Sequence, residues 1–181
     1  MIDQTKLKLF KAAEKILREQ GILALTLSEV AAVAGVSKGG LLYHFPSKSA
    51  LIGALSEFVM SEFEQRIEQS AAGDAASGAW TRGYIRATFS MFNEEGTADP
   101  IPSGALIGML ILEPALLAAY AAHVERWTAR CRADGLNERS TQLIRFAVDG
   151  LWFNESMGLR PLRSGERKEF VEMLVGMTRE H

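Results

Sequence analysis

The side chains best placed for chemistry in this chain suit the binding of nucleic acid. Lys38 begins a short segment that holds two glycines and ends in Tyr43 and His44, and Lys48 follows just after Pro46. Lysines reach phosphates and guanine edges, and hydroxyls near the beginning of helices donate to phosphates. The residues expected to contact DNA are Thr26, Ser37, Lys38, Gly39, Gly40, Tyr43, His44 and Lys48.

Several residues in this group have an alternative explanation that does not involve DNA. Thr26 is equally suited to capping a helix, and Lys38 to being a solvated lysine. Gly39 and Gly40 each cost a helix about 1 kcal/mol relative to Ala. Close approach of the backbone to DNA would explain them, as would simple tolerance of small residues at a surface. Because two glycines leave few side chains to read bases, specificity is expected to depend on Ser37, Lys38, Tyr43 and DNA shape.

Two short helices, expected at 28–34 and 38–45, must position these residues. Ala31 lets the second helix cross closely, and Gly35 permits the left-handed conformation of a tight turn. Helices this short are stable only when packed, and the apolar residues Val30, Val36, Leu41 and Phe45 supply that packing. This is a helix-turn-helix, in which the second helix enters a DNA major groove.

Composition agrees with a DNA-binding module on a larger helical body. The chain has 181 residues, 48% hydrophobic and 23% charged, with five prolines. Its net charge is −2, but residues 1–50 carry +3 and the remainder −5. The single cysteine, Cys131, excludes an intramolecular disulfide and is expected to be a packed core thiol. Without a signal core or a membrane-length apolar run, a cytoplasmic location with no membrane contact is expected.

Helical periodicity extends through most of the chain and predicts an all-α fold of about nine helices. Helices are expected at 5–20, from 48 to about 70, from Trp80 onward, at 105–112, from Pro114 to near Gly135, through 143–157, and at 166–177, with a loop at 93–103. In the final helix Phe170, Met173, Leu174 and Met177 are expected inside. We expect a three-helix DNA-binding domain at 1–46 and an effector-binding and dimerisation domain at 47–181, with 47–70 as the connecting helix.

The last long helices carry more apolar surface than one core uses. Between 143 and 157, one apolar face repeats at steps of three and four residues, while Ile144, Val148, Leu151 and Trp152 cover another. A thick central core would explain this, but a bundle shared with a second copy explains it better. The expected dimer-interface residues are Ala118, Ala122, Leu143, Phe146, Gly150, Phe153 and Met157.

Large aromatic and sulfur-containing side chains in the body are candidates for a ligand pocket. They are Trp80, Tyr84, Phe89, Met91, Phe92, Met109, Trp127, Trp152 and Met157. Such a stripe is also what a plain core looks like, but its abundance favours an apolar or aromatic effector. Arg86, Asp149, Asn154 and Glu155 are candidate polar anchors.

The ordered pattern over the first fifty residues resembles the tetracycline-repressor (TetR) family of bacterial regulators. It comprises residues 9–21, Leu27-Ser-Glu-Val-Ala31, Ala34-Gly-Val-Ser37, Leu41, His44-Phe45, Ser47-Lys48 and Leu51. Residues 146–156 are similar to the penultimate helix of one C-terminal subgroup. The resemblance implies a homodimer that binds a palindromic operator, usually represses, and is released by a small molecule. Many members have Tyr where this chain has Leu42, so the tyrosine's phosphate contact is assigned jointly to Tyr43 and His44.

Other functions find less support in the residues. Three histidines in no metal-ligand spacing, and no nucleophile, Walker or dinucleotide motif, argue against an enzyme, a metal site or a cofactor. A DNA-binding dimer without a small-molecule effector remains an alternative. Activation instead of repression depends on operator position.

Overall fold

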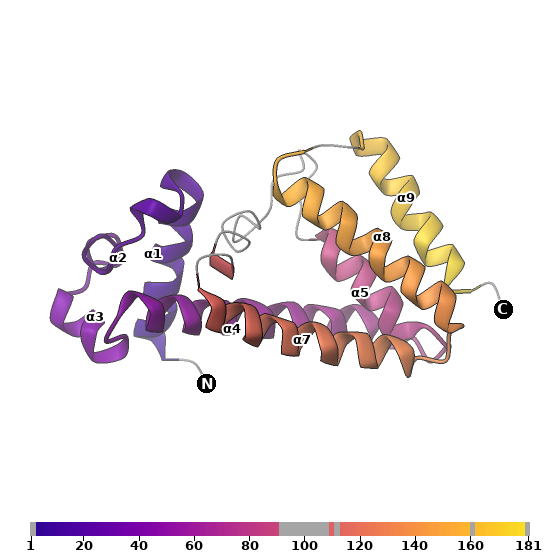
Figure 1. Ribbon diagram of the computed structural model, residues 1–181, viewed down its shortest axis with the longest axis horizontal. Coiled ribbons are helices and arrows are strands. Elements are labelled where there is room, and N and C mark those ends of the chain that lie inside the picture. Colours follow the sequence, from indigo (N-terminus) through magenta and orange to yellow (C-terminus); the bar gives the residue numbers. More distant parts are fainter. Residues whose placement is uncertain (1–2, 91–108, 111–112, 160–161, 180–181) are drawn as a thin grey trace. The chain divides into compact units, whose positions relative to one another are not determined.

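The chain folds as α-helices throughout the part that is described. The computed structural model describes residues 3–90, 109–110, 113–159 and 162–179, which form eight α-helices, one 3-10 turn and no strand (Figure 1). The all-α expectation is confirmed, and the helix count is close to the expected nine. The expected loop at 93–103 and most of the expected helix at 105–112 lie outside the described residues. None of the described helices has the length and apolarity needed to cross a membrane.

The chain divides into two compact units. Residues 1–59 and 100–118 belong to the first, and residues 60–99 and 119–181 to the second. The first contains α1 (Gln4–Gln20), the 3-10 turn η1 (Ile22–Ala24), α2 (Leu27–Ala34), α3 (Lys38–His44) and the beginning of α4 (Lys48–Ala71). In this unit α1 packs on α2, and α2 packs on α3.

Apolar side chains at helical spacing form the core of the first unit. Leu9, Ile16, Val30, Leu41, Leu51 and Leu55 are buried. The ring of Phe10 joins two further elements: its centroid lies 5.6 Å from that of Phe45 and 5.2 Å from that of Phe58 in α4. The packing expected from Val30, Leu41 and Phe45 is therefore confirmed. It holds the short α3 against α1 and α2.

Local hydrogen bonds set the ends of the short helices. The side-chain oxygens of Thr26, Ser37 and Ser47 accept from the backbone N–H groups of Glu29, Gly40 and Ala50, at 3.1, 3.0 and 3.1 Å. Each bond satisfies an orphan donor in a first helical turn. Gly35 ends α2 at φ 67°, in the left-handed region, and thereby allows the turn into α3.

The second unit contains the rest of α4 with α5 (Ala79–Ser90), most of α7 (Pro114–Arg132), α8 (Glu138–Ser156) and α9 (Ser164–Met177). Here α5 packs against α8 and α9, and it is buried over most of its length. Cys131 is buried, as expected. The last helix begins at Ser164, not Glu166, because the Glu166 carboxylate accepts from the Arg163 N–H at 2.8 Å and caps it. Met173 is 53% exposed, so its expected place in the core is wrong.

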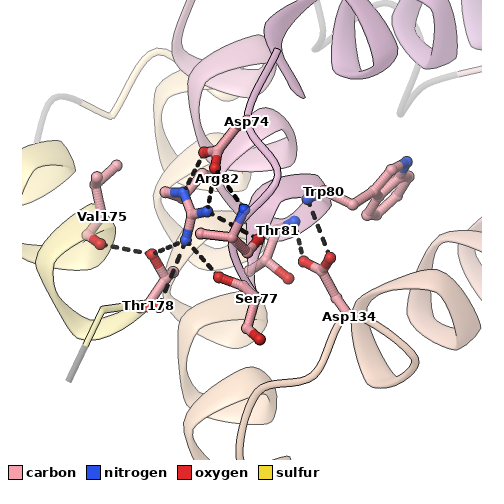
Figure 2. A network of polar contacts seen from close by, with 9 residues as sticks. Asp74, Ser77, Trp80, Thr81, Arg82, Asp134, Val175 and Thr178 are labelled. Carbon is pink, nitrogen blue, oxygen red and sulfur yellow. Dashed lines mark hydrogen bonds and ion pairs between the residues drawn. The ribbon is translucent and has the colours of Figure 1, made fainter. Parts of the chain in front are cut away.

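A buried arginine ties distant segments of this second unit together (Figure 2). Arg82 of α5, 1% exposed, donates to both carboxylate oxygens of Asp74 at 2.7 and 2.8 Å. It also donates to the Ser77 carbonyl at 2.8 Å and to the Thr178 hydroxyl, just after α9, at 3.0 Å. Beside it, the Asp134 carboxylate accepts from the Trp80 and Thr81 N–H groups at 3.2 and 2.7 Å. These bonds fix the first turn of α5.

Candidate functional site

One side of α3 is exposed and the other is buried in the first unit. Leu41 and Phe45 face the core, while Lys38, Gly39, Leu42 and Tyr43 are exposed, with Tyr43 at 86%. Positions 38 and 42, and 39 and 43, are four residues apart and therefore neighbours on one helix face. We call Lys38, Gly39, Leu42 and Tyr43 the outer face of α3. It has the form of a surface that enters a DNA groove.

The two glycines of α3 have different local surroundings. A Cβ at Gly40 would stand 3.3 Å from the Ser37 Oγ that caps the helix. Gly40 therefore leaves room for the cap. A Cβ at Gly39 would meet nothing within 4 Å. Packing within the chain therefore gives no reason for glycine at position 39.

The other residues expected to contact DNA flank this face. Thr26, Ser37 and Lys48 are exposed. The oxygens of Thr26 and Ser37 accept cap bonds, yet each hydroxyl keeps a proton to donate. The His44 side chain is only 15% exposed, and its Nδ1 lies 3.5 Å from the Asp3 carboxylate. His44 is thus the least accessible of the group, whereas Tyr43, whose ring meets it edge-on, points outward.

Aromatic rings gather in the second unit. The Trp127 centroid lies 5.0 Å from that of Phe63 in α4 and 6.5 Å from that of Tyr84 in α5. Tyr84 also stacks on Trp80 at 6.0 Å, and Tyr120 meets Trp127 at 6.5 Å. We call Phe63, Trp80, Tyr84, Tyr120 and Trp127 the aromatic cluster. Among the described atoms, the buried indole N–H groups of Trp80 and Trp127 have no hydrogen-bond partner.

A charged pair lies at the edge of the aromatic cluster. The Tyr84 hydroxyl donates to Asp149, whose other oxygen accepts from Arg145 at 3.0 Å. Burial, and then the Asp149 charge, raise the pKa of Tyr84 well above its ordinary value, so the phenol stays protonated and donating. The Arg145 guanidinium also lies 5.3 Å from the centre of the Tyr84 ring. The Asp149 side chain remains 40% exposed and can accept further bonds.

The remaining ligand candidates are dispersed. Phe89 on α5 and Met109 are buried, Trp152 is half-buried, and Met157 is 52% exposed; Met91 and Phe92 lie outside the described residues. Among the candidate anchors, Arg86 is exposed, and Asn154 donates to the Gly150 carbonyl at 2.7 Å. Glu155 is buried and pairs with Arg167 at 2.8 Å.

The two apolar faces of α8 have opposite environments. Ile144, Val148 and Leu151 are buried. The other face, which we call the α8 stripe, is exposed: Leu143 58%, Phe146 75%, Phe153 48% and Met157 52%, with Gly150 also exposed. Ala118 and Ala122 on α7 are exposed too. The residues expected to form a dimer interface are therefore accessible.

Some residues of these sites were not among the sequence candidates. Phe63 joins the cluster from α4, and the signal that could have found it is its spacing of four residues from the buried Val59 and Ile67. Arg145 stands four residues before Asp149, which is the spacing of a helical ion pair. Leu42 lies on the outer face of α3, one turn after Lys38.

Comparison with known families accounts for both parts of the chain. Residues 9–55 match the model for bacterial regulatory proteins of the tetR family. Residues 78–179 match the model for the tetracyclin repressor-like C-terminal domain. The HTH-type transcriptional regulator CymR of Pseudomonas putida is 39% identical over 63 residues, 35% of this chain and 31% of that protein. The AcrR regulator of Shigella flexneri is 32% identical over 77 residues, 41% of this chain and 36% of that protein. These alignments span about a third of the relatives' own length.

Solved structures share the fold at low sequence identity. A transcriptional regulator from Rhodococcus sp. Rha1 superposes with a TM-score of 0.77 at 16% identity, covering 96% of this chain and 95% of that one. The multidrug binding protein EbrR, complexed with malachite green, superposes with a TM-score of 0.73 at 20% identity, covering 97% and 98%. The helix-turn-helix, the C-terminal match and the shared fold agree. The chain belongs to the tetracycline-repressor (TetR) family of DNA-binding transcriptional regulators, whose members are not enzymes.

Proposed function

We propose that this regulator is a repressor that binds a palindromic operator in the cytoplasm as a homodimer. A small apolar or aromatic effector, bound in the second unit, releases it. The observation that carries the effector is the aromatic cluster, whose two indole N–H groups have no partner in the part of the chain that the structure describes. Buried donors without partners are costly, and a ligand acceptor would relieve that cost.

The chemistry of the cluster suggests what such an effector looks like. Rings from α4, α5 and α7 offer flat apolar contacts, and the half-exposed Asp149 beside Tyr84 offers an acceptor. The complex of the similarly folded EbrR with malachite green supports a flat aromatic compound. We expect a planar molecule with at least one hydrogen-bond acceptor for the indoles.

A ligand screen with an operator readout tests the proposal. Planar aromatic compounds are screened for thermal stabilisation, and each hit is titrated into the protein bound to its operator, identified first on DNA upstream of its own gene. A ligand at 100 times its Kd stabilises the protein by about 2.7 kcal/mol, and it acts on DNA binding only if it prefers the DNA-free state. Hits should stabilise the protein and release the DNA.

Tyr84→Phe provides the matched variant. It keeps the ring in the cluster but removes the hydroxyl that donates to Asp149. Operator binding should persist, while effector affinity changes. If no compound both stabilises the protein and releases DNA, the protein is a DNA-binding regulator that works without a small-molecule effector.

A further inference from the structure

We propose that Leu42 reads the C5-methyl group of a thymine in each operator half-site, and that Gly39 permits the close approach this contact needs. This rests on the proposed operator binding and adds the base chemistry that the site selects. It assigns a specificity role to a residue that stands where many family members have a tyrosine.

The chemistry of the outer face of α3 leads to this assignment. Asn and Gln read adenine, Arg and Lys read guanine, and apolar side chains contact the thymine methyl. Residues 38–44 contain no Asn, Gln, Arg, Asp or Glu. Lys38 is the one lysine there, and Leu42 is the one purely apolar side chain on the outer face, which suits contact with a thymine methyl.

Exposure distinguishes Leu42 from its neighbour Tyr43. Leu42 is 39% exposed, so most of its side chain is covered by the protein and the rest is open to a base edge. Tyr43 at 86% extends outward, as suits a contact to the DNA backbone. Leu42 follows Lys38 by four residues, so both point into the same stretch of groove. A lysine and a leucine at this spacing would read a guanine and a nearby thymine.

Gly39 supplies the second observation. Its Cβ position is open within the protein, so alanine there would fit and would favour the helix. A bare backbone at this point lets α3 lie deeper in the groove and brings the Leu42 side chain to the base edges.

Replacing thymine by deoxyuracil removes only the methyl group, which makes the test specific. The operator is selected in vitro from random DNA, and each thymine is then replaced singly. At one thymine per half-site, deoxyuracil should weaken binding by the wild type about fourfold, the value for one buried methyl group. With Leu42→Ala the same replacement should have no effect. Val33→Ala, which alters an apolar residue of α2 that is also 39% exposed, should keep the fourfold difference.

Gly39→Ala is the second measurement. We expect unchanged or higher thermal stability, with operator affinity lowered at least tenfold. The inference is overturned if no thymine in the operator shows a methyl effect that disappears in Leu42→Ala. It is also overturned if Gly39→Ala binds the operator as tightly as the wild type. Neither result affects the proposed operator binding. Selection of no preferred sequence instead overturns the proposed operator binding, and this inference with it.

Discussion

Lys38 and Lys48 are both exposed lysines near α3, but they are expected to contact different parts of the DNA. Lys38 opens the outer face of α3, whereas Lys48 opens α4, after Pro46 and the Ser47 cap. Phosphate contacts position a protein on DNA, and base contacts specify the sequence. We expect Lys48→Ala to weaken binding equally on all sequences and to lower the salt slope by about 0.9 per lost phosphate contact.

Lys38→Ala should weaken DNA binding and also reduce the difference in affinity between operator and random DNA. Binding titrations at several salt concentrations, on both DNAs, measure the two effects together. An unchanged slope for Lys48→Ala would remove it from the phosphate contacts. Unchanged discrimination by Lys38→Ala would assign that lysine to solvent or phosphate.

Thr26 caps α2 and is also a candidate phosphate contact, and one substitution separates the two roles. Aspartate is as good an N-cap as threonine and adds a favourable charge at the helix beginning. Thr26→Asp should therefore leave urea stability unchanged or slightly raised. Its carboxylate would repel a phosphate, so operator affinity should fall at least tenfold. Full affinity in Thr26→Asp would mean that the residue is a cap alone.

At the scale of elements, the Arg82 network holds α5, the segment before it and the end of α9 in one arrangement. Arg82→Ala removes several charge-assisted hydrogen bonds and leaves carbonyl acceptors without a donor. We expect the free energy of unfolding to fall by about 3 kcal/mol in urea titrations. Arg86→Ala, at an exposed arginine one turn later on α5, should change it by less than about 0.5 kcal/mol. Equal effects would mean that the network contributes little.

The same network predicts how stability responds to acid. Hydrogen bonding from Arg82 lowers the pKa of Asp74 from 3.8 to about 2. Because the pKa of Asp74 is lower in the folded than in the unfolded chain, its pairing with Arg82 stabilises the fold above about pH 4. This stabilisation is lost as pH falls toward about 2. The stability difference between the wild type and Asp74→Asn should therefore shrink over that range. A difference that stays constant from pH 5 to pH 2 would contradict this.

Comparison of α8 with α5 shows what spacing in a sequence can predict. On α8 the two apolar faces could be told apart by periodicity, because the geometry of a helix depends only on neighbouring residues. One of these faces is buried. Arg82 on α5 is the opposite case. A charged residue is expected at the surface, yet Arg82 is 1% exposed. Its charge is paired with Asp74, and one further partner, Thr178, comes 96 residues later. The helix-turn-helix was predictable because its packing and turns are set by residues close together in the chain, between Leu9 and Phe58.

The aromatic cluster also combines features that local sequence patterns predict with contacts that they do not. Trp80, Tyr84 and Trp127 were recognisable as candidates by type and spacing, and their ring contacts bring them together. The bond from Tyr84 to Asp149 joins residues 65 positions apart, so no local pattern encodes it. Whether rings far apart in sequence share a cluster depends on how the helices pack, which the periodicity of each helix does not show.

At the scale of the whole molecule, the α8 stripe carries the expectation of a dimer. Together with Gly150, its four large apolar side chains repeat at alternating three- and four-residue steps, and those four are about half exposed or more. Exposed apolar patches are typical of protein–protein contacts, and we expect a symmetric pair to bury this one. A palindromic operator needs such a pair because each half-site takes one helix-turn-helix.

Phe146→Glu tests this expectation with little risk to the fold, since Phe146 is 75% exposed. Two glutamates facing each other across a two-fold axis would be unpaired charges in an apolar interface, so the variant should be monomeric. Sedimentation equilibrium gives the mass, circular dichroism the helix content, and operator titration the expected loss of affinity. Leu23→Glu, at an 89% exposed leucine in η1, should remain dimeric. A folded Phe146→Glu that still sediments as a dimer would place the interface elsewhere than the α8 stripe.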